Sequence, residues 1–145
     1  MLHIPAKSIT ILQVEKEALE PVYDFLKEEK HKDVFIQPQE KEIERYIYES
    51  KKPVVLLPLV SKSPLQKVNK VTTTTLEKLI VDLYSDQKLF AAFQGSELAH
   101  IVNNAYNRYA IDFTKLLHYA KRRKKDLELI RLFKDNTDIP QNIFR

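Results

Sequence analysis

Hydrophobic positions in the first half of the chain switch between the two-residue period of a strand and the longer period of a helix. Residues 8–14 alternate and are rich in β-branched side chains, which predicts a strand. A helix is expected next, with Pro21 tolerated in its first turn. Its inward face is formed by Leu19, Val22, Tyr23 and Leu26.

A second strand, a second helix and a third strand follow in the same way. Residues 33–37 predict a short strand, and residues 39–50 predict a helix with Ile43, Tyr46 and Ile47 inward. Residues 53–60 (PVVLLPLV) form a continuous apolar run, typical of a strand buried on both faces. This β-α-β-α-β order predicts a parallel sheet with right-handed crossovers. Residues 67–73 are expected to add a short edge strand.

The second half of the chain has the pattern of helices. TTLE, beginning at Thr74, predicts a capping box in which Glu77 reaches back to the helix start. The core face of this helix is expected to consist of Leu76, Leu79, Ile80 and Leu83. Another helix is predicted to begin near Asp86 and to end at Gly95, with Gly95 as a left-handed residue after its last turn.

Two further caps predict the helices at the C-terminal end. Ser96 is expected to cap a helix whose inward residues are Leu98, Ile101, Val102, Ala105 and Tyr109. Asp112 is expected to cap residues 113–123, with Phe113, Leu116, Leu117 and Ala120 inward. We expect a break after this helix and a new start at Asp126, because basic residues suit a helix C-terminus and acidic ones an N-terminus.

Together these elements predict a small α/β fold. A three- to four-stranded, mainly parallel sheet is followed by a C-terminal helical cluster. We expect a single domain over residues 1–136, with a sheet half (1–73) and a helical half (74–136), and a loose tail at 137–145.

Composition narrows the functional classes. The 145 residues include one glycine, Gly95, and no cysteine. The GxGxxG turn, the GxxxxGK[ST] phosphate loop and the GxSxG elbow each need more glycine than this. Without cysteine there is no disulfide, thiol nucleophile or cysteine-ligated zinc. We therefore expect a binding domain without a cofactor rather than an enzyme.

Charge is concentrated near the C-terminus. Residues 101–134 hold 9 Lys and Arg against 3 Asp and Glu, and residues 121–125 (KRRKK), here called the basic run, are all cationic. Such a segment is expected to attract a phosphate backbone or an acidic protein. The candidate binding residues are Lys115, Tyr119, Lys121, Arg122, Arg123, Lys124 and Lys125, with Tyr119 placed to stack. The alternative is an ordinary solvated helix end.

No metal or catalytic constellation emerges from the spacing of the titratable residues. His100 has an acidic residue, Glu97, at a helical ligand spacing, whereas bundle metal sites combine two such motifs on facing helices. A nuclease-like site would need an acid beside an ExK segment on a neighbouring strand, and Asp33 and Glu40 do not meet this pattern. A diverged nuclease-like enzyme and a protein–protein interaction module remain the alternative functions.

Residues 58–123 resemble a known family over their whole length. The features are an apolar strand ending in PLVSKSPL, the segment TLEKLIVDL, then QGSEL and a closing YAKRR. In this order they resemble the C-terminal domain of the AbiEi group of bacterial antitoxins and transcriptional regulators. By this resemblance Glu77, Lys78 and Asp82 belong to the family's helix motif, and residues 121–123 to its basic end.

The resemblance implies a regulatory role in abortive infection. AbiEi proteins are encoded beside an AbiEii-type nucleotidyltransferase toxin, repress their own operon and counteract the toxin without contacting it. Members usually begin with a winged helix-turn-helix, whereas this chain starts almost directly on its first strand. It is therefore expected to be either a fragment or a stand-alone relative.

The first residues have no signal-peptide pattern and the longest apolar run is too short to span a bilayer, so a cytoplasmic location is expected.

Overall fold

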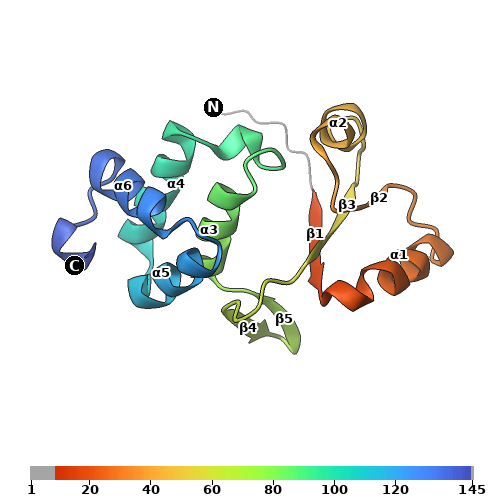
Figure 1. The fold of residues 1–145 in the computed structure, drawn as a ribbon, viewed down its shortest axis with the longest axis horizontal. Coiled ribbons are helices and arrows are strands. Elements are labelled where there is room, and N and C mark those ends of the chain that lie inside the picture. Colours follow the sequence, from red (N-terminus) through yellow and green to blue (C-terminus); the bar gives the residue numbers. More distant parts are fainter. Residues whose placement is uncertain (1–8, 145) are drawn as a thin grey trace. The chain divides into compact units, whose positions relative to one another are not determined.

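The computed structural model describes residues 9–144 and divides the chain into two compact units. We call Met1–Leu59 the sheet unit and Val60–Arg145 the helical unit. Figure 1 labels the helices and strands of both. The predicted α/β class, with a parallel sheet followed by helices, is confirmed.

The sheet unit contains three parallel strands. These are β1 (Thr10–Val14), β2 (Val34–Ile36) and β3 (Val54–Pro58), and β3 is central in the order β1-β3-β2. The register aligns Thr10 and Val34 with Val54. The three predicted strands are thus confirmed with slightly shorter limits, while Ser8, the first residue of the predicted strand, lies outside the described residues.

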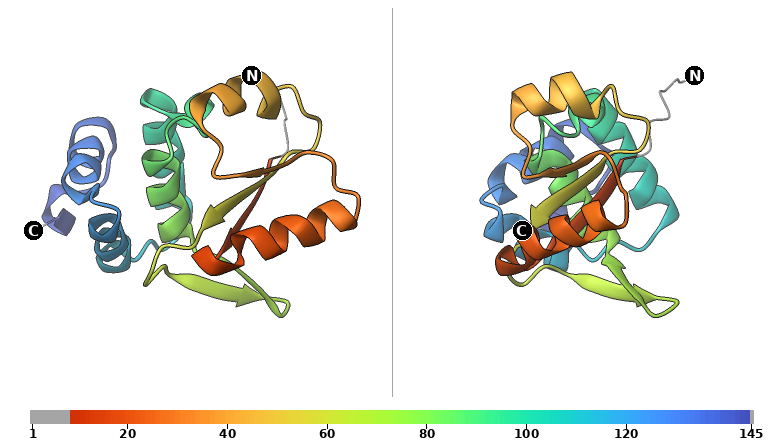
Figure 2. Two further views of the ribbon diagram at one scale, coloured as in Figure 1. Left: turned by 45° about the vertical axis from the view of Figure 1, so that its right-hand side comes forward. Right: turned by 90° about the vertical axis from the view of Figure 1, so that its right-hand side faces the viewer.

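Two helical segments connect these strands. The first crossover is η1 (Lys16–Ala18) and α1 (Leu19–Glu28), with Pro21 in the first turn of α1 as predicted. The second is α2 (Glu40–Glu42) continuing into the wider turn η2 (Ile43–Ile47). The first connection passes β3 to reach β2, and the second returns from β2 to β3. Because the two connections run in opposite directions across the sheet, a right-handed path places them on opposite faces of it, as Figure 2 shows. Leu19, Val34 and Leu56 form the core on the α1 side.

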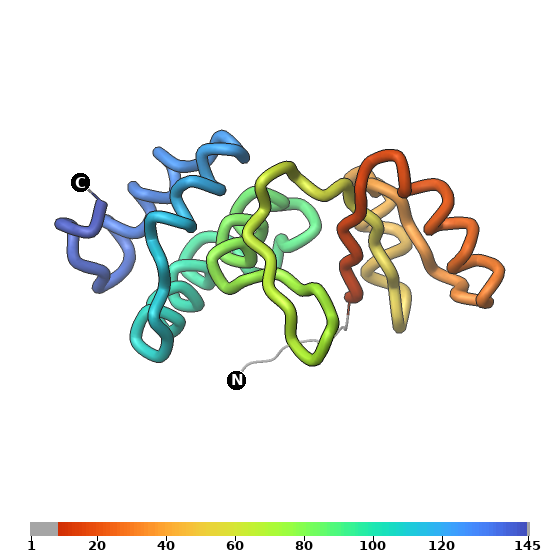
Figure 3. Tube along the Cα trace, turned by 90° about the horizontal axis from the view of Figure 1, so that it is seen from below, coloured from red at the N-terminus to blue at the C-terminus, as the bar shows by residue number. Residues whose placement is uncertain are grey.

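The helical unit begins with a β-hairpin instead of the predicted fourth strand of the sheet. β4 (Leu65–Val68) and β5 (Val71–Thr74) pair antiparallel and form a separate two-stranded sheet. The turn residues Asn69 and Lys70 have φ values of 51° and 67°, as a two-residue hairpin turn requires. Figure 3 shows the hairpin projecting from the helices of this unit.

The helices of this unit enclose one hydrophobic core. They are α3 (Leu76–Ser85), η3 (Ala91–Phe93), α4 (Ser96–Arg108), α5 (Phe113–Arg122), α6 (Asp126–Asn136) and η4 (Gln141–Phe144). The cap predicted at Asp112 and the helix start predicted at Asp126 are both confirmed. The Asp112 side chain accepts a hydrogen bond from the Lys115 N–H. Fully buried core side chains include Ile80, Leu98, Leu116, Leu129 and Phe133.

The prediction for the start of α3 was wrong by one residue. Thr75, not Thr74, is the cap, and its hydroxyl accepts a hydrogen bond from the Lys78 N–H. Thr74 is the last residue of β5. Glu77 therefore has no capping role in α3, and its carboxylate is available to another helix.

The helix predicted between Asp86 and Gly95 is also wrong, because this segment is a loop with the single short turn η3. The Gln94 side-chain amide donates hydrogen bonds to the carbonyls of Leu83 and Phe90, which holds the loop in place without a helix. Gly95 does have a positive φ of 62°, but it precedes α4 as its N-cap, and Ser96 is the first residue of α4.

Three residues predicted to face inward are exposed, and a segment predicted to be loose is packed. Tyr46, Leu79 and Tyr109 are 57%, 41% and 61% exposed. On α3 it is Lys78 and Asp82 that are buried instead of Leu79. After Asn136, Ile139 is buried and the Phe144 ring lies 5.6 Å from that of Phe113. Apolar burial therefore holds the C-terminal segment against the helices.

Candidate functional site

The solvent-facing side of α5 carries a row of basic side chains. Lys115, His118 and Arg122 are spaced i, i+3 and i+7, so they share one face, while Phe113, Leu116 and Ala120 are buried on the other. This face borders a hollow of about 540 Å³, which we call the α5 groove. It is lined by Lys62, Pro64, Asp112, Thr114, Lys115, His118, Tyr119 and Arg122.

The other wall of the groove is the loop that leads into β4. Lys62 and Pro64 line the groove from this loop, and the Arg122 guanidinium donates a hydrogen bond to the Ser61 hydroxyl across it. The Pro64 carbonyl accepts a hydrogen bond from the Thr75 hydroxyl at 3.0 Å. The loop is therefore attached both to α5 and to the start of α3.

Positive charge predominates in the α5 groove. Lys62, Lys115 and Arg122 carry permanent positive charge, and within residues 9–144 none of them forms an ion pair. The one carboxylate that lines the groove, Asp112, already accepts the Lys115 N–H bond that caps α5. Such an arrangement is suited to an anion with several oxygens, because each cation can donate a charge-assisted hydrogen bond.

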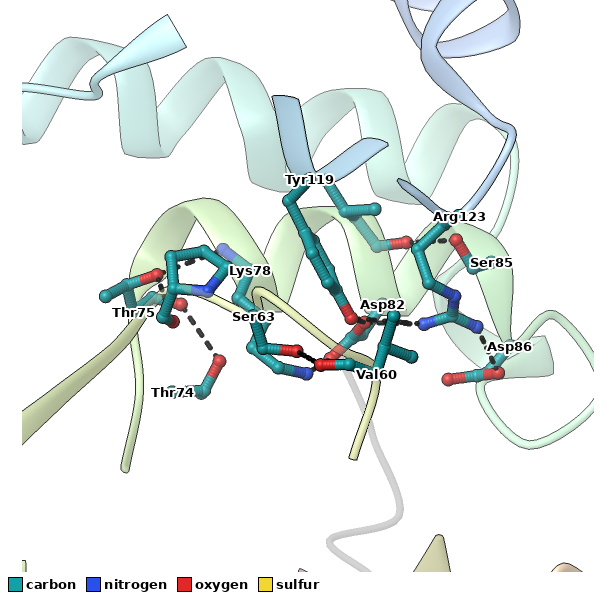
Figure 4. A network of polar contacts seen from close by, with 12 residues as sticks. Val60, Ser63, Thr74, Thr75, Lys78, Asp82, Ser85, Asp86, Tyr119 and Arg123 are labelled. Atoms are coloured by element: carbon teal, nitrogen blue, oxygen red, sulfur yellow. Dashed lines mark hydrogen bonds and ion pairs between the residues drawn. The ribbon is translucent and has the colours of Figure 1, made fainter. Parts of the chain in front are cut away.

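The polar residues on the inner side of α5 form a network with α3. Asp82 forms an ion pair with Lys78 one turn away, and its Oδ1 accepts hydrogen bonds from the Tyr119 hydroxyl and the Arg123 guanidinium, both at 2.7 Å. The Lys78 ammonium lies 5.0 Å from the centre of the Tyr119 ring. Figure 4 shows Tyr119 and Arg123 converging on Asp82. With Asp86, these residues form what we call the Asp82 network.

Asp86 completes the network at its more exposed end. Its Oδ1 lies 2.9 Å from the Arg123 guanidinium. Burial raises the pKa of the Asp86 carboxyl, and the neighbouring Arg123 reverses only part of that effect. The pKa of Arg123 is also raised: burial lowers it, but the bond to Tyr119 and the charges of Asp86 and Asp82 outweigh burial. Two cations face two carboxylates, so the network neutralises itself.

The basic run therefore has several separate roles. Lys121 and Arg122 are exposed, while Arg123 is bound to Asp82 and Asp86. Lys124 has a φ of 60° and follows the C-cap of α5, and the Lys125 ammonium lies 3.6 Å from the Glu128 carboxylate. The run does not form one continuous cationic surface.

The predicted stacking role of Tyr119 is wrong. Its side chain is 1% exposed and its hydroxyl is bound to Asp82, because Tyr119 lies on the buried face of α5. The residues that the AbiEi resemblance assigns to a helix motif, Glu77, Lys78 and Asp82, also form contacts within the fold. Glu77 accepts a hydrogen bond from the Asp112 N–H at 2.9 Å and so connects α3 with the start of α5.

Sequence reasoning overlooked Lys62, Thr114 and His118 as groove residues. The spacing of Lys115, His118 and Arg122 was a visible signal, since i, i+3 and i+7 positions share one helix face. Lys62 gave no such signal, because its position beside α5 depends on tertiary packing.

Residues 9–144 contain no group of three His, Asp or Glu side chains arranged to hold a metal ion, so Glu97 and His100 have no third ligand there. Over the same residues, no helix has the length and apolar character needed to cross a bilayer.

The fold and the groove define a two-unit α/β protein with a cationic surface on its helical unit. The chain belongs to DUF6577, a family of unknown function, whose model matches residues 1–139. No curated protein matches the chain. No solved structure matches it either.

Proposed function

We propose that the helical unit is a non-catalytic domain that binds the phosphate backbone of nucleic acid in the α5 groove. The observation that carries this proposal is the meeting of Lys62 with Lys115 and Arg122 in one hollow. Within residues 9–144 none of the three is neutralised by an ion pair. The planar Arg122 guanidinium matches phosphate oxygens in geometry, and the two lysines add point charges.

The distribution of charge between the two units supports the same proposal. The helical unit holds 15 Lys and Arg against 9 Asp and Glu, net +6, whereas the sheet unit holds 9 against 11, net −2. A polyanion would be attracted to the helical unit in particular, since attraction by net charge acts over about 10 Å at ordinary salt. The α5 groove provides specific donors within this field.

The groove is suited to the backbone of a nucleic acid more than to its bases. The larger of the two rings that line it, Tyr119, is 1% exposed and cannot stack on a base, which leaves the His118 imidazole as the one exposed ring among the lining residues. Contacts to phosphate fix position without reading sequence. The proposal therefore predicts sequence-tolerant binding that weakens steeply with salt.

The resemblance to AbiEi proteins supports a biological setting for this binding. In that setting the chain is a cytoplasmic regulatory or antitoxin-type domain of an abortive-infection system, paired with an AbiEii-type nucleotidyltransferase toxin. Co-expression with such a toxin from a neighbouring gene is then expected to restore growth. Continued growth arrest with both proteins present at normal levels would contradict the antitoxin role while leaving nucleic-acid binding intact.

Nucleic-acid binding is tested with two matched double variants. Lys115→Ala/Arg122→Ala removes a lysine and an arginine from the groove, and Arg131→Ala/Lys134→Ala removes the same pair from exposed positions on α6. Fluorescence anisotropy with labelled nucleic acid over a salt series gives the slope of log K against log salt. We expect the groove variant to reduce this slope by about 2 and the α6 variant to leave it nearly unchanged. Equal effects of the two variants would refute the groove as the binding site.

A further inference from the structure

The β4–β5 hairpin and the loop before it form a second cationic surface. Residues 60–75 contain Lys62, Lys67 and Lys70 and no aspartate or glutamate. All four residues of β4 are exposed. The hairpin thus presents positive charge without the carboxylates that usually accompany lysine on a solvated surface.

The tip of the hairpin also exposes apolar side chains. Val68 and Val71 are paired in register directly beside the turn and are 50% and 63% exposed. Two β-branched side chains opposite each other form a small apolar ridge on one face. A surface that combines lysines with an apolar tip is complementary to a partner that carries negatively charged groups on its outside and less polar groups further inside.

The base of the hairpin is fixed beside the α5 groove. Pro64 lines the groove and accepts hydrogen bonds from both the N–H and the hydroxyl of Thr75, at 3.3 and 3.0 Å. The Gln66 side-chain amide donates to the Thr74 carbonyl at 3.0 Å. Lys62 belongs to both surfaces, so the cationic surface continues from the groove to the start of β4.

We infer that the β4–β5 hairpin inserts into the major groove of a DNA duplex whose phosphates are held by the α5 groove. This inference rests on the proposed function and adds the class of nucleic acid to it. The major groove of B-form DNA admits a two-stranded β-ribbon, whereas that of A-form RNA is too deep and narrow for side chains to read. Lys67 and Lys70 bind phosphates, and Val68 and Val71 contact the apolar parts of base edges, such as the thymine methyl group.

A single strand fits the same surface poorly. Proteins that bind single strands stack bases on exposed aromatic rings. Residues 60–75 contain no aromatic residue, the Tyr119 ring in the groove is buried, and a lone exposed imidazole, His118, provides no row of rings for successive bases. The chemistry of the surface therefore favours a duplex.

The test measures binding of the full chain to a labelled DNA duplex, the RNA duplex of the same sequence and the separate DNA strand. The hairpin variant is Lys67→Gln/Lys70→Asn, because asparagine tolerates the φ of 67° at position 70. Its matched control is Lys51→Gln/Lys52→Asn, at two exposed lysines of the sheet unit. A third variant, Val68→Ser/Val71→Ser, removes the apolar pair and keeps all the charges. Thermal melting establishes that each variant is folded.

We expect the DNA duplex to bind more tightly than the RNA duplex or the single strand. The lysine variant should lower the salt slope on the DNA duplex by about 2, and the control should not. The valine variant should weaken DNA binding without changing the slope, since it removes no charge.

Each contrary result has a distinct meaning. Wild-type affinity in both folded hairpin variants, with the salt slope still reduced in Lys115→Ala/Arg122→Ala, would overturn the hairpin inference and leave the proposed function standing. Preference of the wild type for the single strand or the RNA duplex would also overturn the inference. Absence of binding by the wild type to all three nucleic acids would overturn the inference and the proposed function together.

Discussion

The Tyr119 hydroxyl donates a hydrogen bond of 2.7 Å to Asp82 Oδ1, and this contact joins α5 to α3 inside the helical unit. It determines which face of α5 is available for binding. With Tyr119 and Ala120 turned inward, Lys115, His118 and Arg122 are turned toward the α5 groove. The buried polar network and the exposed basic face are thus two sides of one helix.

The Asp82 network predicts a sharp difference between two neighbouring carboxylates. Asp82→Asn should destabilise the protein by about 3–5 kcal/mol, because it removes the negative charge that pairs with the fully buried Lys78. Asp86→Asn should cost less than about 1 kcal/mol at pH 7, since Asp86 has the more exposed side chain and is penalised by burial when ionised. Urea unfolding measures both values. Similar losses for the two variants would contradict the assigned roles.

The raised pKa of Asp86 predicts a pH dependence of stability with a definite sign. A carboxyl whose pKa is higher in the folded protein binds its proton more tightly there. Its contribution to stability is fully present below the ordinary value of 3.8 and is lost as pH rises through the raised pKa. The free energy of unfolding of Asp86→Asn should therefore rise relative to wild type as pH increases through this interval. Urea unfolding over a pH series tests this, and a constant or falling difference would contradict it.

Two lysines with a left-handed backbone conformation are positions where a substitution should stabilise the fold. Lys124 and Lys30 have φ values of 60° and 68° and follow α5 and α1, where glycine is the usual residue. Lys124→Gly and Lys30→Gly should each stabilise by about 0.5–1 kcal/mol, because relief of backbone strain exceeds the entropy that glycine adds to the unfolded chain. Lys121→Gly inside α5 is the control and should destabilise by about 1 kcal/mol. A loss of stability in both test variants, measured by urea unfolding, would disprove this reading.

Much of the fold could be predicted because its elements depend on local signals. The three strands of the sheet unit and their parallel pairing could be predicted from the apolar run of β3 and the helical spacing between the strands, whereas the central place of β3 could not. Asp112 was recognisable as a cap from its position before an amphipathic segment. Local signals did not predict burial correctly where tertiary contacts determine it. Leu79 is exposed because Lys78 and Asp82 are buried on α3 as an ion pair.

The candidate site was predictable only in part for the same reason. The sequence displays residues 121–125 as one block, but α5 turns Arg122 and Arg123 in different directions, one to the groove and one to Asp82. Lys62 is separated from Arg122 by most of the helical unit and meets it only after folding. Six non-glycine residues between positions 9 and 144, Lys62 among them, have a positive φ. In a chain with one glycine, lysine, asparagine and glutamine thus occupy the left-handed positions of these turns.

Under the proposed function, Arg122 holds phosphates together with Lys62 and Lys115, which the fold brings to it, and not together with its neighbours in the basic run. The most direct measurement compares Lys62→Asn with Lys121→Asn in DNA-duplex binding over a salt series. Asparagine suits the φ of 61° at Lys62, and both lysines are exposed, but Lys62 lines the groove while Lys121 lies in the run. The account predicts that Lys62→Asn lowers the salt slope by about 1 and that Lys121→Asn leaves it near the wild-type value. A lower slope for Lys121→Asn with an unchanged slope for Lys62→Asn would contradict it.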